Sequence, residues 1–383
     1  MKILIDIEGF VNRGDQLMFC AIAEAVQAHR PNAELVLPPK LLSRRELRQL
    51  SDLPFRELVD CRKVGRRLTA GLTGTLSRLG LCPAPVWPAQ VDLVLHAPGY
   101  RYSDAFPLRR ADSIRQDVSY FRAFSKSGRR IVFLPQAFGP FDTDGARSRI
   151  RAIVPFADEI YARDATSFAH LKALFPKASN IFRAPDFTCG CRGRLPPGFA
   201  LRRYGVIIPN GKMISHTELG AALYLDFLCA VASLFRENGL DVVLLNHEGA
   251  GDRKIIDDLR NRIEGPITCF NDVTGLDCKG IIGGAALVVT SRFHGAVSGF
   301  CQGVPTLCTG WSHKYRELAA EFGCPESCLD PKNPEKSLAA VADALRHPSA
   351  YAADAAHVTA VTDRTSSMWA SVFAGLQRKG DRT

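Results

Sequence analysis

The chain has 383 residues, of which 46% are hydrophobic and 23% are charged, and its net charge at pH 7 is +10. This composition is typical of a globular protein and excludes a largely disordered or fibrous chain, while the length favours two domains. The positive charge favours an anionic partner, which can be a phosphorylated ligand, an anionic lipid surface or nucleic acid. No recognition motif supports specific nucleic-acid binding.

The first residues of the chain show no targeting signal, and the cysteines show no metal-binding pattern. Acids break the apolar run in the first eight residues, so they do not resemble a signal peptide. No stretch approaches the ~20 apolar residues of a membrane span. The twelve cysteines are scattered without zinc-site spacing. We therefore expect reduced cysteines, no metal and a cytoplasmic location.

In the first half of the chain, apolar runs of strand length alternate with helical periodicity. The predicted strands are 2–7, 91–96, 131–134, 159–162 and 181–184, and the predicted helices are 17–28, 111–127, 146–154 and 166–174. Segment 40–81 breaks the pattern, with ten Lys/Arg and four Asp/Glu among leucines. It is either a solvated helical insertion or a basic amphipathic patch that contacts an anionic membrane.

A loop rich in Gly, Pro and Arg, 190–197, predicts a linker to a second strand–helix series. Its predicted strands are 205–208, 242–245, 286–290 and 306–308, and its helices are 218–238, 253–263, a short one after His294, and a tail over 334–376. Repeated strand–helix units indicate parallel sheets covered by helices. We expect an α/β protein with two Rossmann-like domains facing a cleft. The domains are 1–195, with the basic insertion at 40–81, and 196–347, followed by a C-terminal helix and tail at 348–383.

The most informative motif is Ser291-Arg292-Phe293-His294-Gly295, which follows the predicted strand 286–290 and opens a helix. Ligands bind at the carboxyl ends of strands in open parallel sheets. A guanidinium offers paired donors to phosphate or carboxylate, and a histidine carries a proton near neutral pH. The motif predicts a site that holds a small phosphorylated or carboxylated molecule and moves a proton on it.

Other predicted strands are also followed by candidate site residues: Asn12, Gly14, Asp15, Gly99, Arg163, His247 and Lys314. Asp15 can accept a proton from a hydroxyl nucleophile, and Arg163 can add a second guanidinium for a dianion. Each residue also has a structural explanation when it is taken alone. This is a turn or helix cap for Asn12, Gly14, Asp15 and Gly99, a surface ion pair for Arg163, a structural histidine for His247 and a surface lysine for Lys314. The sequence lacks the P-loop, the dinucleotide-binding fingerprint and the nucleophile elbow, which argues against NTPases, dehydrogenases and α/β-hydrolases.

Over about residues 1–330 the chain resembles the polysaccharide pyruvyl transferase family. The resemblance rests on Ser291–Gly295 followed by Gly303-Val304-Pro305 and Lys314-Tyr315, and on weaker matches at Asn12-x-Gly14-Asp15, Arg163-Asp164-x-x-Ser167, Pro185-Asp186 and Asn246-His247. The family implies a glycosyltransferase B-like fold. It also implies transfer of pyruvate from phosphoenolpyruvate to a sugar as a cyclic ketal.

The resemblance further implies roles for single residues. Arg292, Phe293 and Lys314 would bind the donor in the second domain, and Arg163 of the first domain would hold the same donor. His294 would be the general acid, and Asp15 would be the base. Asn12, Gly14, Gly99 and His247 would be further cleft contacts. The chain departs from the family at His96-Ala97-Pro98-Gly99-Tyr100, where a run of glycines is usual.

We therefore expect a pyruvyl transferase of cell-surface polysaccharide synthesis. It would need phosphoenolpyruvate as co-substrate, no further cofactor, and a sugar or lipid-linked oligosaccharide as acceptor. Peripheral contact with the inner face of the membrane through 40–81 is left open. Two other classes also stay open: a nucleotide-sugar glycosyltransferase, for which Glu317 and Glu321 are available, and a non-catalytic binding homologue.

Overall fold

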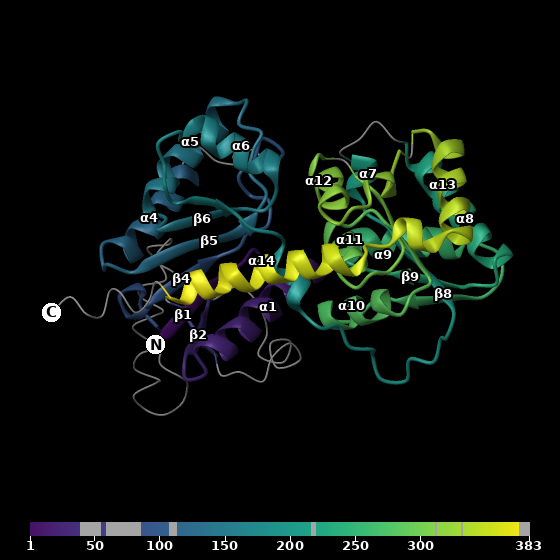
Figure 1. Cartoon of the computed structure of the whole chain (residues 1–383), viewed down its shortest axis with the longest axis horizontal. Helices are drawn as coiled ribbons and strands as arrows, with labels where there is room; N and C mark the ends of the chain where they lie inside the picture. Colours follow the sequence, from purple (N-terminus) through teal and green to yellow (C-terminus); the bar gives the residue numbers. More distant parts are fainter. Residues whose placement is uncertain are drawn as a thin grey trace. The chain divides into compact units, whose positions relative to one another are not determined.

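The structure, a computed structural model, describes residues 1–38, 55–58, 86–106, 113–215, 220–310, 312–330 and 332–374. The chain divides into two compact units (Figure 1). Unit 1 takes its described residues from 1–10, 18–187 and 365–383, and unit 2 takes them from 11–17 and 188–364. No helix in the described part of the chain is long and apolar enough to span a bilayer.

Unit 1 is built on a parallel sheet in the order β3-β2-β1-β4-β5-β6-β7. Its strands are β1 (Lys2–Asp6), β2 (Glu34–Leu37), β3 (Phe55–Glu57), β4 (Leu93–His96), β5 (Arg130–Gln136), β6 (Glu159–Ala162) and β7 (Ile181–Arg183). Its helices are α4 (Ser113–Ser125), α5 (Asp144–Ile153), α6 (Ala165–Leu174), most of α1 (Arg13–His29) and the end of α14 (Ala355–Ala374). Apolar residues of α4, α5 and α6 pack on the strands and form one core.

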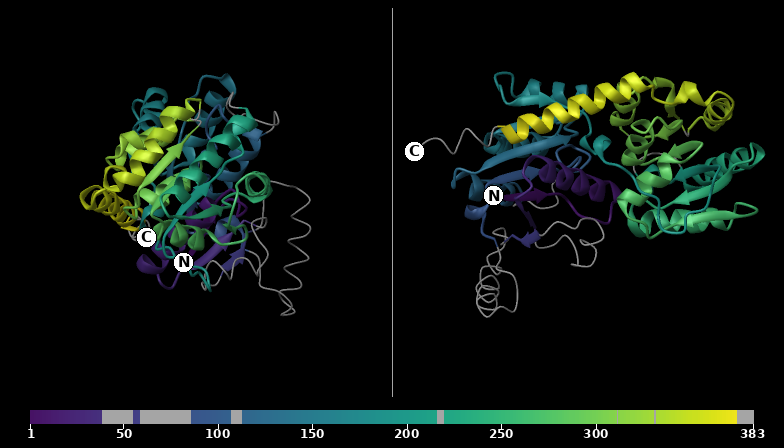
Figure 2. Two further views of the ribbon diagram at one scale, coloured as in Figure 1. Left: turned by 90° about the vertical axis from the view of Figure 1, so that its right-hand side faces the viewer. Right: turned by 60° about the horizontal axis from the view of Figure 1, so that its bottom comes forward.

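Unit 2 contains a second parallel sheet in the order β10-β9-β8-β11-β12-β13. Its strands are β8 (Tyr204–Ile208), β9 (Asp241–Leu245), β10 (Ile267–Phe270), β11 (Leu287–Thr290), β12 (Thr306–Thr309) and β13 (Cys328–Leu329). Its helices are α7 (Lys212–Ser215), α8 (Ala221–Glu237), α9 (Gly249–Arg260), α10 (Gly275–Gly283), α11 (Phe293–Phe300), α12 (Lys314–Glu321) and α13 (Pro334–Arg346). Further views of both units appear in Figure 2.

Both faces of the second sheet are buried, which explains why its central strands are apolar throughout. Along β8, Ile207 packs on the side of α8 and α9, whereas Val206 and Ile208 pack on the side of α10. Successive side chains of a strand point to opposite faces, so each face takes alternate residues. The α/β prediction with two parallel halves is confirmed.

The units differ from the expected ranges 1–195, 196–347 and 348–383 at three places. The boundary falls between Phe187 and Thr188, because the loop after it pairs with unit 2, where Arg194 N–H donates to the Leu276 carbonyl at 3.0 Å. Residues 11–17 belong to unit 2. The end of α14 belongs to unit 1, where Arg30 Nη2 donates to the Phe373 carbonyl at 2.8 Å. The predicted basic segment 40–81 lies outside the described residues, except for 55–58.

Candidate functional site

The strand order of each sheet reverses direction next to its first strand, between β1 and β4 in unit 1 and between β8 and β11 in unit 2. In an open parallel sheet, ligands bind outside the carboxyl ends of the strands at such a point. In unit 2, the loops that leave β8 and β11 here carry Asn210, Lys212 and the motif Ser291–Gly295. The topology therefore places the motif at the point where the fold binds ligands.

Hydrogen bonds hold the turn between β11 and α11 in one shape. Thr290 Oγ1 accepts from the Arg292 N–H at 3.0 Å. The Ser291 carbonyl accepts from Asn210 Nδ2 at 2.8 Å and from the Tyr315 hydroxyl at 2.9 Å. Arg292 is the last residue before α11, and His294 lies in its first turn, 9% exposed. Both side chains therefore start from a fixed backbone.

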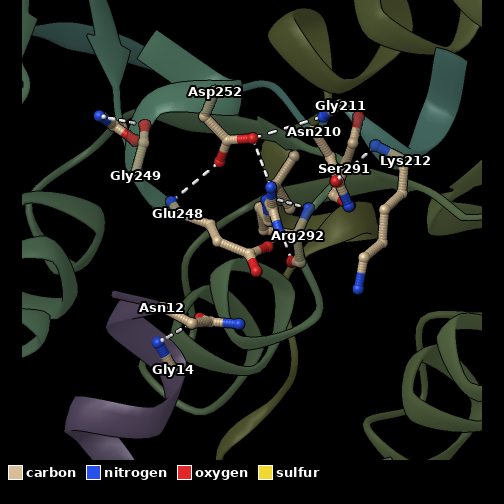
Figure 3. A network of polar contacts seen from close by, with 12 residues as sticks. Asn12, Gly14, Asn210, Gly211, Lys212, Glu248, Gly249, Asp252, Ser291 and Arg292 are labelled. Carbon is tan, nitrogen blue, oxygen red and sulfur yellow. Dashed lines mark hydrogen bonds and ion pairs between the residues drawn. The ribbon is translucent and has the colours of Figure 1, made fainter. Parts of the chain in front are cut away.

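Two carboxylates hold the guanidinium of Arg292 (Figure 3). Asp252 belongs to α9, and Glu248 is the residue just before that helix. Nη1 of Arg292 pairs with Glu248 and its Nη2 with Asp252. Burial lowers the pKa of Arg292 to about 10, so the group stays protonated at neutral pH. Burial also raises the pKa of Asp252, and the backbone N–H groups that it accepts from oppose this. The sequence prediction of Arg292 as a donor-binding residue did not include these two partners.

The first turn of α1 packs against His294 inside unit 2. A Cβ atom on Gly14 would lie 2.1 Å from His294 Nδ1 and 2.7 Å from its Cγ, so only glycine fits there. The Gly14 N–H donates to Asn12 Oδ1 at 2.8 Å, as Figure 3 shows. Asp15 lies within this turn rather than before it, because α1 begins at Arg13. The candidate acid and the turn that carries the candidate base therefore share one unit.

Lys212 is a site residue that the sequence analysis missed. It opens α7 just after β8. Burial and the nearby Arg292 lower the pKa of its ammonium, and Asp15 and Asp252 act in the opposite direction. These interactions place Lys212 among the charged groups of the site. A lysine soon after a buried strand was a usable signal, since the same argument selected Arg292.

Phe293 and Lys314 form an adjoining group. The Lys314 ammonium lies 5.4 Å from the Phe293 ring centre and 5.6 Å from that of Tyr315. The two rings meet edge to face with centroids 5.8 Å apart. Lys314 is 8% exposed, so its charge is set against aromatic faces rather than in bulk water. The structure therefore brings Lys314 next to the motif.

His247 follows β9 and is 1% exposed. Its carbonyl accepts from the Arg13 N–H at 2.8 Å, and the next residue, Glu248, forms an antiparallel bridge with Asn12. Burial, then Arg292, His294 and Arg13, lower the pKa of His247 well below its ordinary value. The imidazole is therefore neutral at physiological pH, and the guanidinium groups of Arg292 and Arg13 lie near it.

Two predicted site residues, Arg163 and Gly99, lie in unit 1. Arg163 follows β6 and pairs through Nη1 with Asp186 Oδ2 at 3.0 Å, and both side chains are buried. Asp164 caps α6 by accepting from the Ser167 N–H at 2.6 Å. Gly99 follows β4 with φ +74°, a conformation that favours glycine.

His96, at the end of β4, links the glycine-poor segment that follows to β1. The His96 ring bonds Asp6 Oδ2 through Nδ1 at 2.6 Å and the Tyr102 hydroxyl through Nε2 at 2.7 Å. All three residues are less than a tenth exposed. The side chain of His96 therefore takes a structural role at this strand end. In the part of the chain that the structure describes, no group of three or more His, Cys, Asp or Glu side chains could hold a metal ion.

Solved structures show the fold. The UDP-GlcNAc 2-epimerase of Neisseria meningitidis, bound to UDP-GlcNAc, has a TM-score of 0.61 at 11% identity, with 98% of this chain and 100% of that chain covered. A putative UDP-N-acetylglucosamine 2-epimerase of Listeria monocytogenes has a TM-score of 0.64 at 12% identity, with 98% and 97% covered. The Methanocaldococcus jannaschii UDP-GlcNAc 2-epimerase, in complex with UDP-GlcNAc and UDP, has a TM-score of 0.54 at 13% identity, with 90% and 93% covered. These likenesses confirm the glycosyltransferase B-like fold class.

Among curated protein sequences, none matches this chain. The sequence model of the polysaccharide pyruvyl transferase family matches residues 12–313. The match begins at Asn12, just before the turn of α1 that packs on His294, and it includes the whole motif Ser291–Gly295. It covers most of the chain, which therefore belongs to the polysaccharide pyruvyl transferase family.

Proposed function

We propose that this protein transfers pyruvate from phosphoenolpyruvate to a pair of sugar hydroxyls, forming a cyclic ketal on a cell-surface polysaccharide or its lipid-linked precursor. The observation that carries the proposal is the contact between Gly14 and His294 in a member of this family. It brings the turn that carries Asp15 to the residue proposed as general acid, at the ligand-binding edge of the sheet.

The chemistry uses an acid, a base and cationic groups. His294 protonates the methylene carbon of the enol, which becomes a methyl group, and the adjacent carbon takes on oxocarbenium character. A sugar hydroxyl attacks that carbon while Asp15 accepts its proton. Inorganic phosphate leaves with the electrons of its C–O bond, and the second hydroxyl closes the ketal by attacking the same carbon and passing its proton to the released phosphate. The products are the pyruvylated sugar and phosphate, and no cofactor beyond phosphoenolpyruvate is invoked.

Cationic groups would bind the donor and stabilise the charge on the departing phosphate. We assign donor contacts to Arg292, Phe293, Lys314 and Arg163. Arg292 and Arg163 each already hold a buried carboxylate. The proposal therefore requires each guanidinium to share its N–H groups between that carboxylate and the donor. Asn12, Gly99 and His247 are the further contacts that we propose.

A thermal-shift screen with phosphoenolpyruvate, UDP, GDP and CMP tests the donor. A ligand that binds only the folded state raises the melting temperature. A rise with phosphoenolpyruvate alone supports the proposal. A rise with UDP alone would instead favour a nucleotide-sugar enzyme, the second candidate, because the similar solved structures are UDP-GlcNAc 2-epimerases.

Turnover separates an enzyme from a non-catalytic binding homologue. Incubation with phosphoenolpyruvate and candidate lipid-linked sugars should release phosphate and produce a ketal methyl signal in proton NMR. Binding of phosphoenolpyruvate without phosphate release from any acceptor would favour the non-catalytic homologue.

A lipid-linked acceptor would be presented at a membrane surface, and we propose that segment 40–81 contacts that surface. Segment 40–81 carries a local excess of six positive charges, and each basic residue near an anionic surface contributes about 1 kcal/mol at most. Sedimentation with anionic and neutral vesicles at low and high salt tests this. If both vesicle types bring down equal amounts of protein at low salt, the membrane contact is excluded and the segment is only a solvated insertion.

A further inference from the structure

Buried polar atoms without a hydrogen-bond partner gather around His247. Among the residues that the structure describes, such atoms include both ring nitrogens of His247, Oδ1 of Asn246 and the Nε atoms of Arg13 and Arg292. Most buried polar groups in proteins are hydrogen-bonded, so a concentration of exceptions calls for an explanation. His247 is the clearest case, because it is 1% exposed and neither nitrogen is satisfied.

Backbone contacts fix where His247 lies. Its carbonyl accepts from the Arg13 N–H at 2.8 Å, and Glu248 bridges to Asn12, so the loop after β9 and the first turn of α1 form one surface. A Cβ atom on Gly275 would lie 2.5 Å from the Arg13 carbonyl, so this turn is held closely from the side of α10 as well. His247 and Arg13 are therefore anchored beside each other.

The charges around His247 are positive. Arg292 and Arg13 carry positive charges that disfavour a further proton on it, and His294 acts in the same direction. The carboxylates of Glu248 and Asp252 are engaged with Arg292. A neutral imidazole keeps one N–H donor and one acceptor nitrogen. A water molecule could satisfy these hydrogen bonds, whereas an anion would satisfy them and also offset the converging positive charge.

An anion beside the first turn of α1 would have to accept its hydrogen bonds from side chains. The first backbone N–H groups of α1 are already used, since Arg13 N–H donates to His247, Gly14 N–H to Asn12 Oδ1, and Asp15 N–H to the Asn12 carbonyl at 3.1 Å. The guanidinium of Arg13 and the ring of His247 remain as donors. A guanidinium and an imidazole N–H match the several acceptor oxygens of a phosphoryl group.

We propose that Arg13 and His247 form an oxyanion subsite that takes the phosphoryl group of a phosphorylated ligand. This deepens the proposed function and rests on it for the ligand's identity, which would be phosphoenolpyruvate. The phosphoryl group then lies against the first turn of α1, close to the proton donor His294. Arg292, held by Glu248 and Asp252, is left to face the carboxylate end of the donor.

The experiment measures binding of inorganic phosphate, pyruvate and phosphoenolpyruvate by calorimetry. The variants are Arg13→Gln, His247→Phe and the donor-retaining His247→Gln. Arg260→Gln and His347→Gln are matched controls on exposed surface of unit 2. Loss of a hydrogen bond to a charged group corresponds to a fall in affinity of about ten- to a hundredfold.

We expect phosphate and phosphoenolpyruvate to bind that much more weakly to Arg13→Gln and His247→Phe, with pyruvate affinity unchanged and partial rescue in His247→Gln. Circular dichroism identifies a variant that fails to fold, in which case Arg13→Gln decides. Wild-type phosphate affinity in Arg13→Gln overturns the subsite, as does failure of the wild-type protein to bind phosphate. An equal loss of pyruvate affinity overturns the phosphoryl assignment. Phosphate binding that depends on Arg13, without any binding of phosphoenolpyruvate, supports the subsite and sinks the proposed function instead.

Discussion

Replacing Gly14 by alanine adds one methyl group at the point where α1 meets His294. The new Cβ would lie 2.1 Å from Nδ1, 2.7 Å from Cγ and 2.9 Å from Cε1 of the imidazole. Such distances are far inside van der Waals contact, so the ring has to move. The backbone of Gly14 has no positive φ that would itself disfavour alanine. The effect of the substitution therefore isolates this one contact.

Two opposing terms set the change in stability. Alanine is favoured over glycine within a helix by up to about 1 kcal/mol, and overpacking a buried site costs about 1–3 kcal/mol. The free energy of unfolding should therefore fall by roughly 0–2 kcal/mol. Turnover should change far more, because a displaced general acid loses a contribution of about 10²–10⁴. We expect Gly14→Ala to stay folded and to lose at least about a hundredfold in turnover.

Gly251→Ala is the matched control, because Gly251 also lies in the first turn of a helix of unit 2 and its added Cβ would meet nothing within 4 Å. That variant should keep wild-type turnover and gain up to about 1 kcal/mol. Urea unfolding and phosphate release from phosphoenolpyruvate measure the two quantities. If Gly14→Ala matches Gly251→Ala in turnover, His294 is not the acid in this position and the reasoning fails.

Three further predictions concern His294, the pair Arg292 and Arg163, and His247. His294→Ala should lower turnover by about two to four orders of magnitude with little change in donor affinity, and unchanged turnover would remove the histidine from the mechanism. Arg292→Lys and Arg163→Lys keep the charge but lose the paired donors, so calorimetry should show clearly weaker phosphoenolpyruvate binding; wild-type affinity in both excludes a shared donor clamp. The pKa of His247 is lowered on folding, so below about pH 6.5 the unfolded chain binds more protons than the folded protein. The free energy of unfolding should therefore fall as the pH drops through that range, by at most about 1.4 kcal/mol per pH unit. Urea unfolding from pH 7.5 to 5 should show a flatter profile in His247→Gln, and an identical slope would exclude His247 as the cause.

Central elements of the fold were predictable because they are buried on both faces. The strands β8, β9 and β11 read as apolar runs, and the structure places them in the middle of the second sheet. The strands β2, β10 and β13 gave no such signal. β10 and β13 are short strands at the edges of their sheet, and the residues of β10 are all half-buried. A short edge strand that is buried on fewer sides needs fewer apolar residues, so its sequence gives a weaker signal for a strand.

The site was predictable as far as strand ends reveal it, since Arg292, His294 and His247 each follow a buried strand. The charge balance of the site was not predictable, because Glu248 and Asp252 reach Arg292 from the start of another helix, α9. Their spacing of four residues at the start of a helix puts both on one face, yet nothing in that spacing names the arginine they hold.

The role of Gly14 was also hidden, since a turn that follows β1 of unit 1 in sequence belongs to unit 2 in space. Local pattern showed a glycine before a helix, which any turn explains. The contact with His294 shows why an added side chain is excluded there. A glycine in the first turn of a helix acquires functional meaning only once its nearest neighbour is known, and here that neighbour is His294, the proposed proton donor.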